Sequence, residues 1–138
     1  MNKPELKKKL HRYCALDAER RQILRELERV AMLMGVPKVA STNDGPRAPG
    51  IGNPVHDAVA RKTELESQYY RKVAQMMDAQ KEIEALIDCL EPTERQIMRY
   101  RYLDGLAWEE VCVKIGYSWR QTHRTHSRAL DTILRKMA

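Results

Sequence analysis

Four arginines near the end of the chain have a spacing that suits binding to nucleic acid. Arg120, Arg124 and Arg128 follow one another at intervals of four, and Arg135 falls on the same side of a helix. A guanidinium group pairs bidentately with guanine O6 and N7 or with phosphate, and Gln121 and His123 add groups that can read base edges. Residues 116–138 carry five basic and one acidic side chain, a net charge of +4, which equals that of the longer segment 1–34 in a chain of net charge +6. A solvated helix face is the more common reason for such a charge run, so the surrounding elements decide the interpretation.

Local signals place these arginines on the last of three short helices. Pro92 suits the first residue of a helix that runs to about Leu103, and a second helix, 108–115, ends at Gly116. The hydroxyl of Ser118 can cap a final helix that continues to about Lys136. Two helices joined by a three-residue turn, with a supporting helix in front, indicate a helix-turn-helix.

Two longer periodic segments precede this region. Apolar residues recur at threes and fours in residues 4–34 and again in 54–90, a pattern of coiled-coil type. Residues 35–53 have no period and are rich in Gly, Pro, Ser and Asn, which is typical of a loop. We therefore expect an all-α protein: a long antiparallel helical hairpin over residues 1–90, for oligomerisation or partner binding, and a DNA-binding domain over 91–138.

Residues 90–130 resemble region 4 of bacterial primary sigma factors and the related C-terminal domain of phage late-operon activators of the ArpU and RinA type. The resemblance covers 41 of 138 residues. The matching pieces are Leu90-x-Pro92-x-Glu94-Arg95, Arg101-Tyr102-x-Asp104-Gly105, Trp108-x-Glu110-Val111, Ile115-Gly116, Ser118 and Arg128-Ala129-Leu130. The family implies a sigma-like helix-turn-helix that binds DNA sequence-specifically and assists RNA polymerase.

The resemblance also implies roles for single residues. The base-reading positions of the family fall on Trp119, Arg120, His123 and Arg124, and its helix cap falls on Ser118. Two features depart from the family pattern. Ala107 stands where a Ser or Thr caps the preceding helix, and Thr122 and Thr125 occupy apolar positions of the recognition helix. The base preference of the family therefore does not transfer to this chain.

Patterns typical of enzymes or of metal sites are weak in this sequence. His123 and His126 lie three residues apart, but Asp131 is the one further ligand type close to them. No Walker-type loop, nucleophile elbow or H-E-x-x-H motif occurs, and the three cysteines are widely spaced. We expect no catalytic residue, no cofactor and no metal.

The sequence therefore predicts a transcriptional regulator of a phage or prophage late operon. Arg128, Arg135 and Lys136 are expected on phosphates of double-stranded DNA, and Arg120, Gln121, His123 and Arg124 on bases. RNA polymerase and a second copy of the chain are the other expected partners. The alternatives are a DNA-packaging protein similar to a small terminase subunit, and a protein that docks on RNA polymerase. No apolar stretch approaches the roughly 18 residues of a membrane span, so we expect the cytoplasm of a bacterial host cell.

Overall fold

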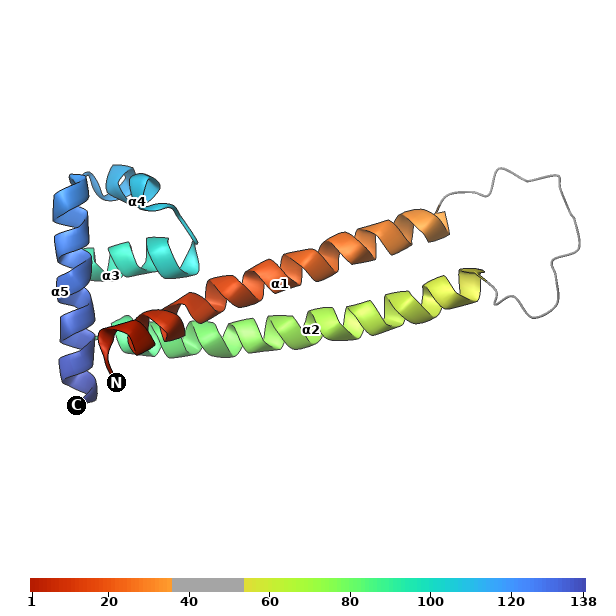
Figure 1. Ribbon diagram of the computed structural model, residues 1–138, viewed down its shortest axis with the longest axis horizontal. Helices are drawn as coiled ribbons and strands as arrows, with labels where there is room; N and C mark the ends of the chain where they lie inside the picture. The colour runs from red at the N-terminus through yellow and green to blue at the C-terminus, as the bar shows by residue number, and fades with distance from the viewer. Residues whose placement is uncertain (36–53) are drawn as a thin grey trace, which may run out of the picture. The chain divides into compact units, whose positions relative to one another are not determined.

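The computed structural model describes residues 1–35 and 54–138, and these residues form helices and short connections without a strand (Figure 1). The prediction of an all-α protein is confirmed for this part of the chain. The predicted loop lies outside the described residues, apart from Gly35 at the end of the first helix. The elements in order are α1 (Lys3–Gly35), α2 (Pro54–Ile87), α3 (Pro92–Met98), the π-helical turn η1 (Arg99–Leu103), α4 (Trp108–Ile115) and α5 (Trp119–Met137).

The described chain divides into two compact units. The first unit joins residues 1–17 to residues 75–138, and the second comprises residues 18–74. The sequence predicted a boundary between residues 90 and 91, so the observed division differs from the expected one. Leu6 and Leu10 explain the difference, because both side chains are fully buried in the same core as α5.

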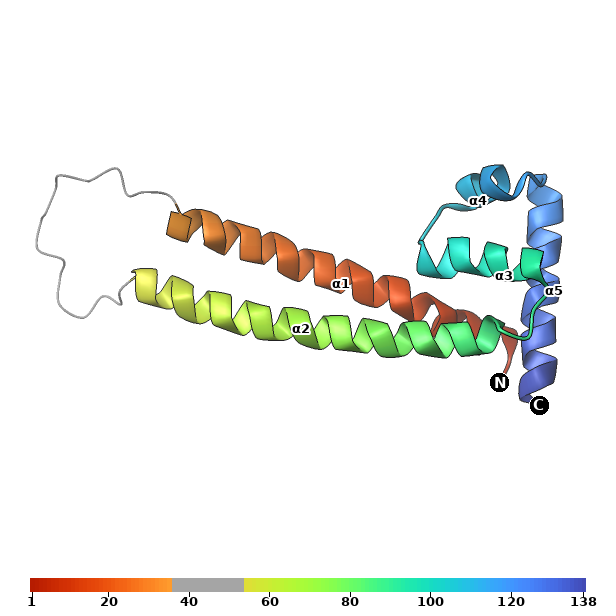
Figure 2. The same cartoon turned by 180° about the vertical axis from the view of Figure 1, so that it is seen from behind.

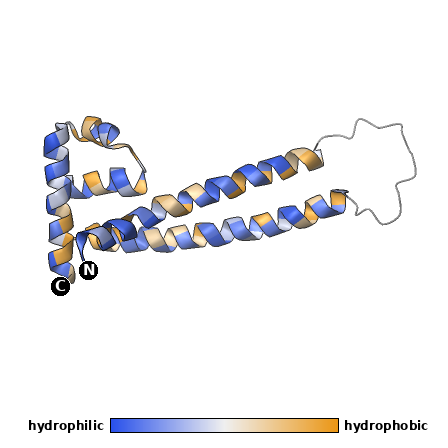
Figure 3. Cartoon of the chain, in the orientation of Figure 1, coloured by the Kyte–Doolittle hydropathy of each residue, from blue (hydrophilic) through white to orange (hydrophobic). Residues whose placement is uncertain are grey.

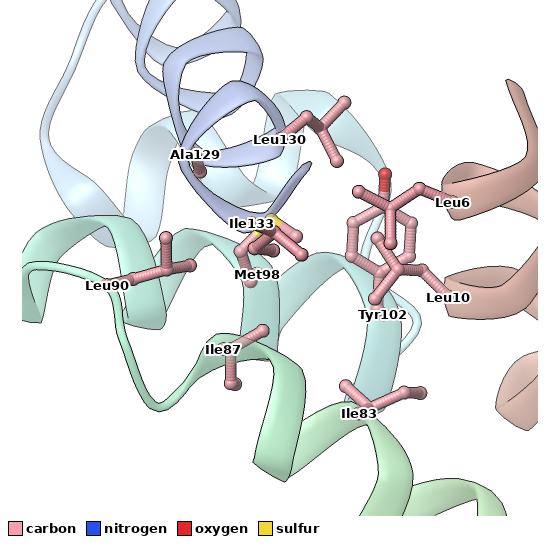
Figure 4. Packing of buried hydrophobic residues seen from close by; sticks show 10 residues of the cluster. All are labelled: Leu6, Leu10, Ile83, Ile87, Leu90, Met98, Tyr102, Ala129, Leu130 and Ile133. Atoms are coloured by element: carbon pink, nitrogen blue, oxygen red, sulfur yellow. The ribbon is translucent and has the colours of Figure 1, made fainter. Parts of the chain in front are cut away.

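The main core of the first unit draws apolar side chains from every helical element in it except α4. Figure 4 shows these side chains turned toward one another from α1, α2, α3, η1 and α5. Burial of each Leu, Ile or Met side chain contributes about 1.5–3 kcal/mol to folding. The buried residues are Leu6, Leu10, Ile83, Ile87, Leu90, Met98, Tyr102, Ala129, Leu130 and Ile133.

The turn between α4 and α5 has the end signals that the sequence predicts. Gly116 follows α4 with φ +77°, a left-handed conformation that glycine adopts without the steric cost of a side chain. The Ser118 hydroxyl accepts a hydrogen bond from the Gln121 backbone N–H at 3.1 Å. Both predictions, the end of α4 and the cap of α5, are confirmed.

Ala107 leaves the other end of α4 without a side-chain cap. The Glu110 carboxylate accepts from the Ala107 N–H at 3.4 Å, but alanine has no oxygen to accept a bond from the helix in return. The backbone of Ala107 is extended, as an N-cap requires. We expect Ala107→Ser to raise the free energy of unfolding by about 1 kcal/mol in urea denaturation. Ser118→Ala is the matched opposite change and lowers it by a similar amount; an unchanged midpoint for Ala107→Ser would contradict this assignment.

In the described chain, the second unit consists of the second half of α1 and the first part of α2. Arg61 pairs with Glu26 at 3.0 Å, Lys72 pairs with Glu19, and these partners run in opposite directions along the two helices. Leu65 is buried between them, whereas Leu24 and Val59 of the same unit remain partly exposed. This unit therefore combines ion pairs at its surface with the burial of an apolar side chain, Leu65.

No helix within residues 1–35 or 54–138 is long and apolar enough to cross a membrane.

Candidate nucleic-acid interface

Helix α5 has one buried face and one basic face. The buried residues are Thr122, Thr125, His126, Ala129, Leu130 and Ile133. The exposed residues of the opposite face are Arg120, Gln121, Arg124, Arg128, Asp131 and Arg135. Figure 3 shows that hydrophilic residues dominate the N-terminal half of the helix and that hydrophobic ones gather toward its C-terminal half. The N-terminal half therefore presents polar groups to its surroundings, as base readout requires.

Helices α3 and α4 support the first half of α5. Both views of the ribbon show them beside this part of the helix (Figures 1 and 2). Val111 of α4 and Ile97 of α3 are fully buried. The packing of α3 and α4 against α5 thus fixes the backbone positions from which the exposed arginine side chains of α5 extend.

Thr122 and Thr125 occupy the core positions that the sequence assigned to them. Thr122 is fully buried, and Thr125 is 7% exposed. The Thr125 hydroxyl donates to the Gln121 carbonyl at 2.8 Å, which satisfies the buried group within the helix. The Thr122 hydroxyl oxygen has no hydrogen-bond partner. A hydroxyl buried without a partner lowers stability, so Thr122 has a cost for the fold.

Asp131 is the one acidic residue of α5, and α1 neutralises it. Lys3 reaches across from α1 to pair with the Asp131 carboxylate at 3.0 Å and to donate to the Ser127 hydroxyl at 3.1 Å. Without Lys3, the carboxylate would repel a phosphate approaching the arginines on either side of it. The first turn of α1 therefore contributes a positive charge that reduces the negative potential of Asp131 on this face.

His123 is less exposed than the other residues that the sequence predicted for base reading. Its ring is half-buried between two indoles, with centroid distances of 4.5 Å to Trp108 and 4.4 Å to Trp119. Its Nε2 atom is buried and has no hydrogen-bond partner. The guanidinium of Arg101, a residue of η1, lies 4.9 Å from the centroid of the Trp108 ring. His123 thus packs between the indoles, while Trp119 itself is exposed.

The remaining predicted residues stay on the surface. Ser118 caps α5, and Arg120, Gln121, Arg124 and Arg128 extend from its first half. Arg135 and Lys136 are exposed in the last turn, about two turns beyond Arg128. The exposed residues of the first half of α5 therefore lie together. Arg135 and Lys136 lie apart from them along the helix axis.

Glu94 of α3 is a residue that the sequence did not assign to this site. It is 7% exposed, its Oε2 atom has no hydrogen-bond partner, and it lines a groove of about 340 Å³ between α3 and α5. Arg124 and Arg128 line the same groove. From the sequence, Glu94 is an ordinary acidic residue in the first turn of a helix. Its position in the same groove as Arg124 and Arg128 depends on packing between α3 and α5, and Glu94 and Arg124 are thirty residues apart in the sequence.

A buried hydrogen bond anchors α5 to η1. We assign the neutral Nδ1–H form to His126, in which the Tyr102 hydroxyl donates to Nε2 at 2.7 Å. Burial, with a contribution from the nearby Lys7 charge, lowers the pKa of His126 from 6.5 to about 4. Burial also raises the pKa of Tyr102 to about 12. Both groups are therefore neutral at pH 7.

This pair makes stability depend on pH. An unfolded His126 binds a proton near its ordinary pKa of 6.5, whereas the folded one resists protonation down to about pH 4. The stabilising effect is complete above pH 6.5 and is lost as the pH falls toward 4, by about 3 kcal/mol for a shift of this size. We expect urea denaturation to show this loss between pH 7.5 and 4.5.

A His126→Gln variant separates this effect from the titration of carboxylates. It should lose less stability than the parent chain over the same pH interval. His56→Gln, at an exposed position of α2 in the second unit, is the matched control and should keep the parent pH dependence. Equal pH dependence in His126→Gln and the parent would contradict the assignment.

No family model, curated protein or solved structure matches this chain.

Proposed function

We propose that this protein is a sequence-specific regulator that binds double-stranded DNA. The exposed arginine face of α5 is the observation that carries the proposal. Arg120, Arg124 and Arg128 lie on it at successive turns, the opposite face is packed, and Lys3 neutralises Asp131. A helix with this distribution can enter the major groove while its other face stays in the core.

In the proposed complex, α4 and α5 act as a sigma-like helix-turn-helix. Arg120, Gln121 and Arg124 contact base edges, and Arg128, Arg135 and Lys136 contact phosphates. The position of His123 between the two indoles supports a role in holding Trp119, in place of the direct base contact expected from the sequence. The phosphate contacts set the register of the helix, and the base contacts supply specificity.

The proposal also assigns a biological context and further partners. The chain acts on a phage or prophage late operon, as the resemblance to activators of the ArpU and RinA type implies, and assists RNA polymerase. Helices α1 and α2 form an antiparallel hairpin through which two copies associate. The ion pairs Arg61–Glu26 and Lys72–Glu19 and the partly exposed apolar residues of the second unit support this arrangement.

The salt dependence of DNA binding tests whether the arginine face is the interface. For duplex DNA, the logarithm of the affinity falls with the logarithm of the salt concentration by about 0.9 for each phosphate contact. Fluorescence anisotropy with a random-sequence duplex should therefore give a less steep slope when Arg120, Arg124 and Arg128 are replaced together by alanine. We expect the magnitude of the slope to decrease by up to about 2.7. The full decrease corresponds to three arginines that each contact a phosphate in the non-specific complex.

A matched control has the same spacing on a different helix. Arg21, Arg25 and Arg29 are exposed on α1 within the second unit, also at intervals of four residues. Replacing these three by alanine removes equal charge and should leave the slope closer to that of the parent chain. Equal losses in both triple variants would show that net charge, and not the face of α5, determines binding.

A further inference from the structure

Trp119 is an exposed aromatic residue at the beginning of α5. Its side chain is 52% exposed, although tryptophan is usually largely buried in folded proteins. It directly precedes Arg120 and follows the capping residue Ser118. The indole therefore lies at the end of the helix that presents the arginines to DNA.

A stack of rings holds this indole in place. Trp119 packs on His123 at a centroid distance of 4.4 Å, and His123 packs on Trp108 at 4.5 Å. Arg101 lies against the Trp108 ring and also donates to the Leu106 carbonyl at 2.9 Å. Because these contacts already order the side chain in the free protein, Trp119 loses little conformational freedom on binding.

The geometry of the stack limits what Trp119 can contact. A side chain inserted between two base pairs needs both faces of its ring free, and His123 already packs against this indole with the two ring planes inclined by 48°. Apart from the Nε1–H on its edge, the exposed part of the indole is apolar surface at the position next to Arg120. In the major groove, the apolar group that a base presents to such a surface is the 5-methyl group of thymine.

We propose that Trp119 contacts the 5-methyl group of one thymine and so makes the protein prefer thymine at that position. This inference rests on the proposed function, because it requires α5 to lie in the major groove. It adds an apolar contact to the polar readout by arginine. Burial of one methyl group predicts a preference of about fourfold for thymine over deoxyuridine, which differs from it by that methyl alone.

Deoxyuridine substitution tests the contact. The probes are duplexes enriched from a random library by the full-length chain, with each thymine of the motif replaced singly by deoxyuridine. We expect the parent chain to bind one of these duplexes about fourfold more weakly by fluorescence anisotropy. Trp119→Ala should bind the thymine and deoxyuridine forms of that duplex equally. Trp119→Phe, which keeps an aromatic surface, should retain part of the preference.

Met137→Ala is the matched control, because Met137 is another exposed apolar residue of α5 at its far end. It should keep the thymine preference of the parent. A motif in which no thymine is sensitive to the substitution, or a preference that persists in Trp119→Ala, would overturn this inference and leave the proposed function intact. Binding without any enriched motif would overturn both. Tighter binding to the single strands of the motif than to the duplex would instead indicate stacking on an unpaired base.

Discussion

Arg124→Ala is expected to lose discrimination at one base pair of the target and to keep it at the others. The guanidinium extends from the exposed face in the first half of α5, where a bidentate contact with guanine is possible. Loss of such a contact should reduce the preference at that position by about 1–3 kcal/mol, or roughly 5- to 150-fold. The measurement is the affinity for an enriched duplex and for its complete set of single-base-pair variants. Arg120→Ala should behave in the same way at a different base pair.

Lys136→Ala provides the contrast for this prediction. Lys136 is exposed in the last turn of α5, far from the first half of the helix. A lysine on a phosphate contributes to binding of every sequence, so its loss should weaken all duplexes alike. If Arg124→Ala and Lys136→Ala gave the same profile across the variants, the division into base-reading and phosphate-binding residues would be wrong.

Leu10→Ala is expected to destabilise the first unit strongly, although Leu10 lies about eighty residues before the beginning of the sigma-like segment. Its side chain is fully buried in one core with Tyr102, Leu130 and Ile133. Truncation of a buried leucine leaves a cavity and costs about 2–5 kcal/mol. Urea denaturation followed by circular dichroism measures this loss, and DNA binding should fall with the folded fraction.

Leu24→Ala is the control for this effect. Leu24 is on the same helix but in the second unit, and its side chain is 38% exposed. We expect its replacement to cost less than about 1 kcal/mol, because little apolar surface is lost from a packed environment. Similar stabilities for the two variants would mean that residues 91–138 fold without α1, as the sequence alone suggested.

Local signals in the sequence were sufficient for the ends of the short helices. Pro92, Gly116 and Ser118 act through their own backbone or through residues three positions away, so their effects are visible without tertiary structure. The arginine face of α5 follows in the same way from the helical period. The π-helical turn at Arg99–Leu103 was not predicted, because it continues α3 with no change in composition that distinguishes the two.

Contacts between distant segments were beyond the reach of periodicity. The apolar spacing of α1 is similar around Leu10 and around Leu27, so the pattern does not reveal that α1 takes part in two different units. The same limit applies to His123, whose neighbour Trp108 is fifteen residues away on another helix. It also applies to Glu94, which faces a groove shared with two arginines of α5.

Selection from a random pool of double-stranded DNA, with the full-length chain at near-physiological salt, tests the central claim most directly. The account predicts enrichment of one motif, and a palindromic motif if two copies bind as a symmetric dimer. The Arg120→Ala/Arg124→Ala variant should fail to enrich that motif. Binding of the parent chain without enrichment would contradict sequence-specific regulation. The basic helix would then serve non-specific DNA contact, as in packaging, or docking on an acidic protein surface such as that of RNA polymerase.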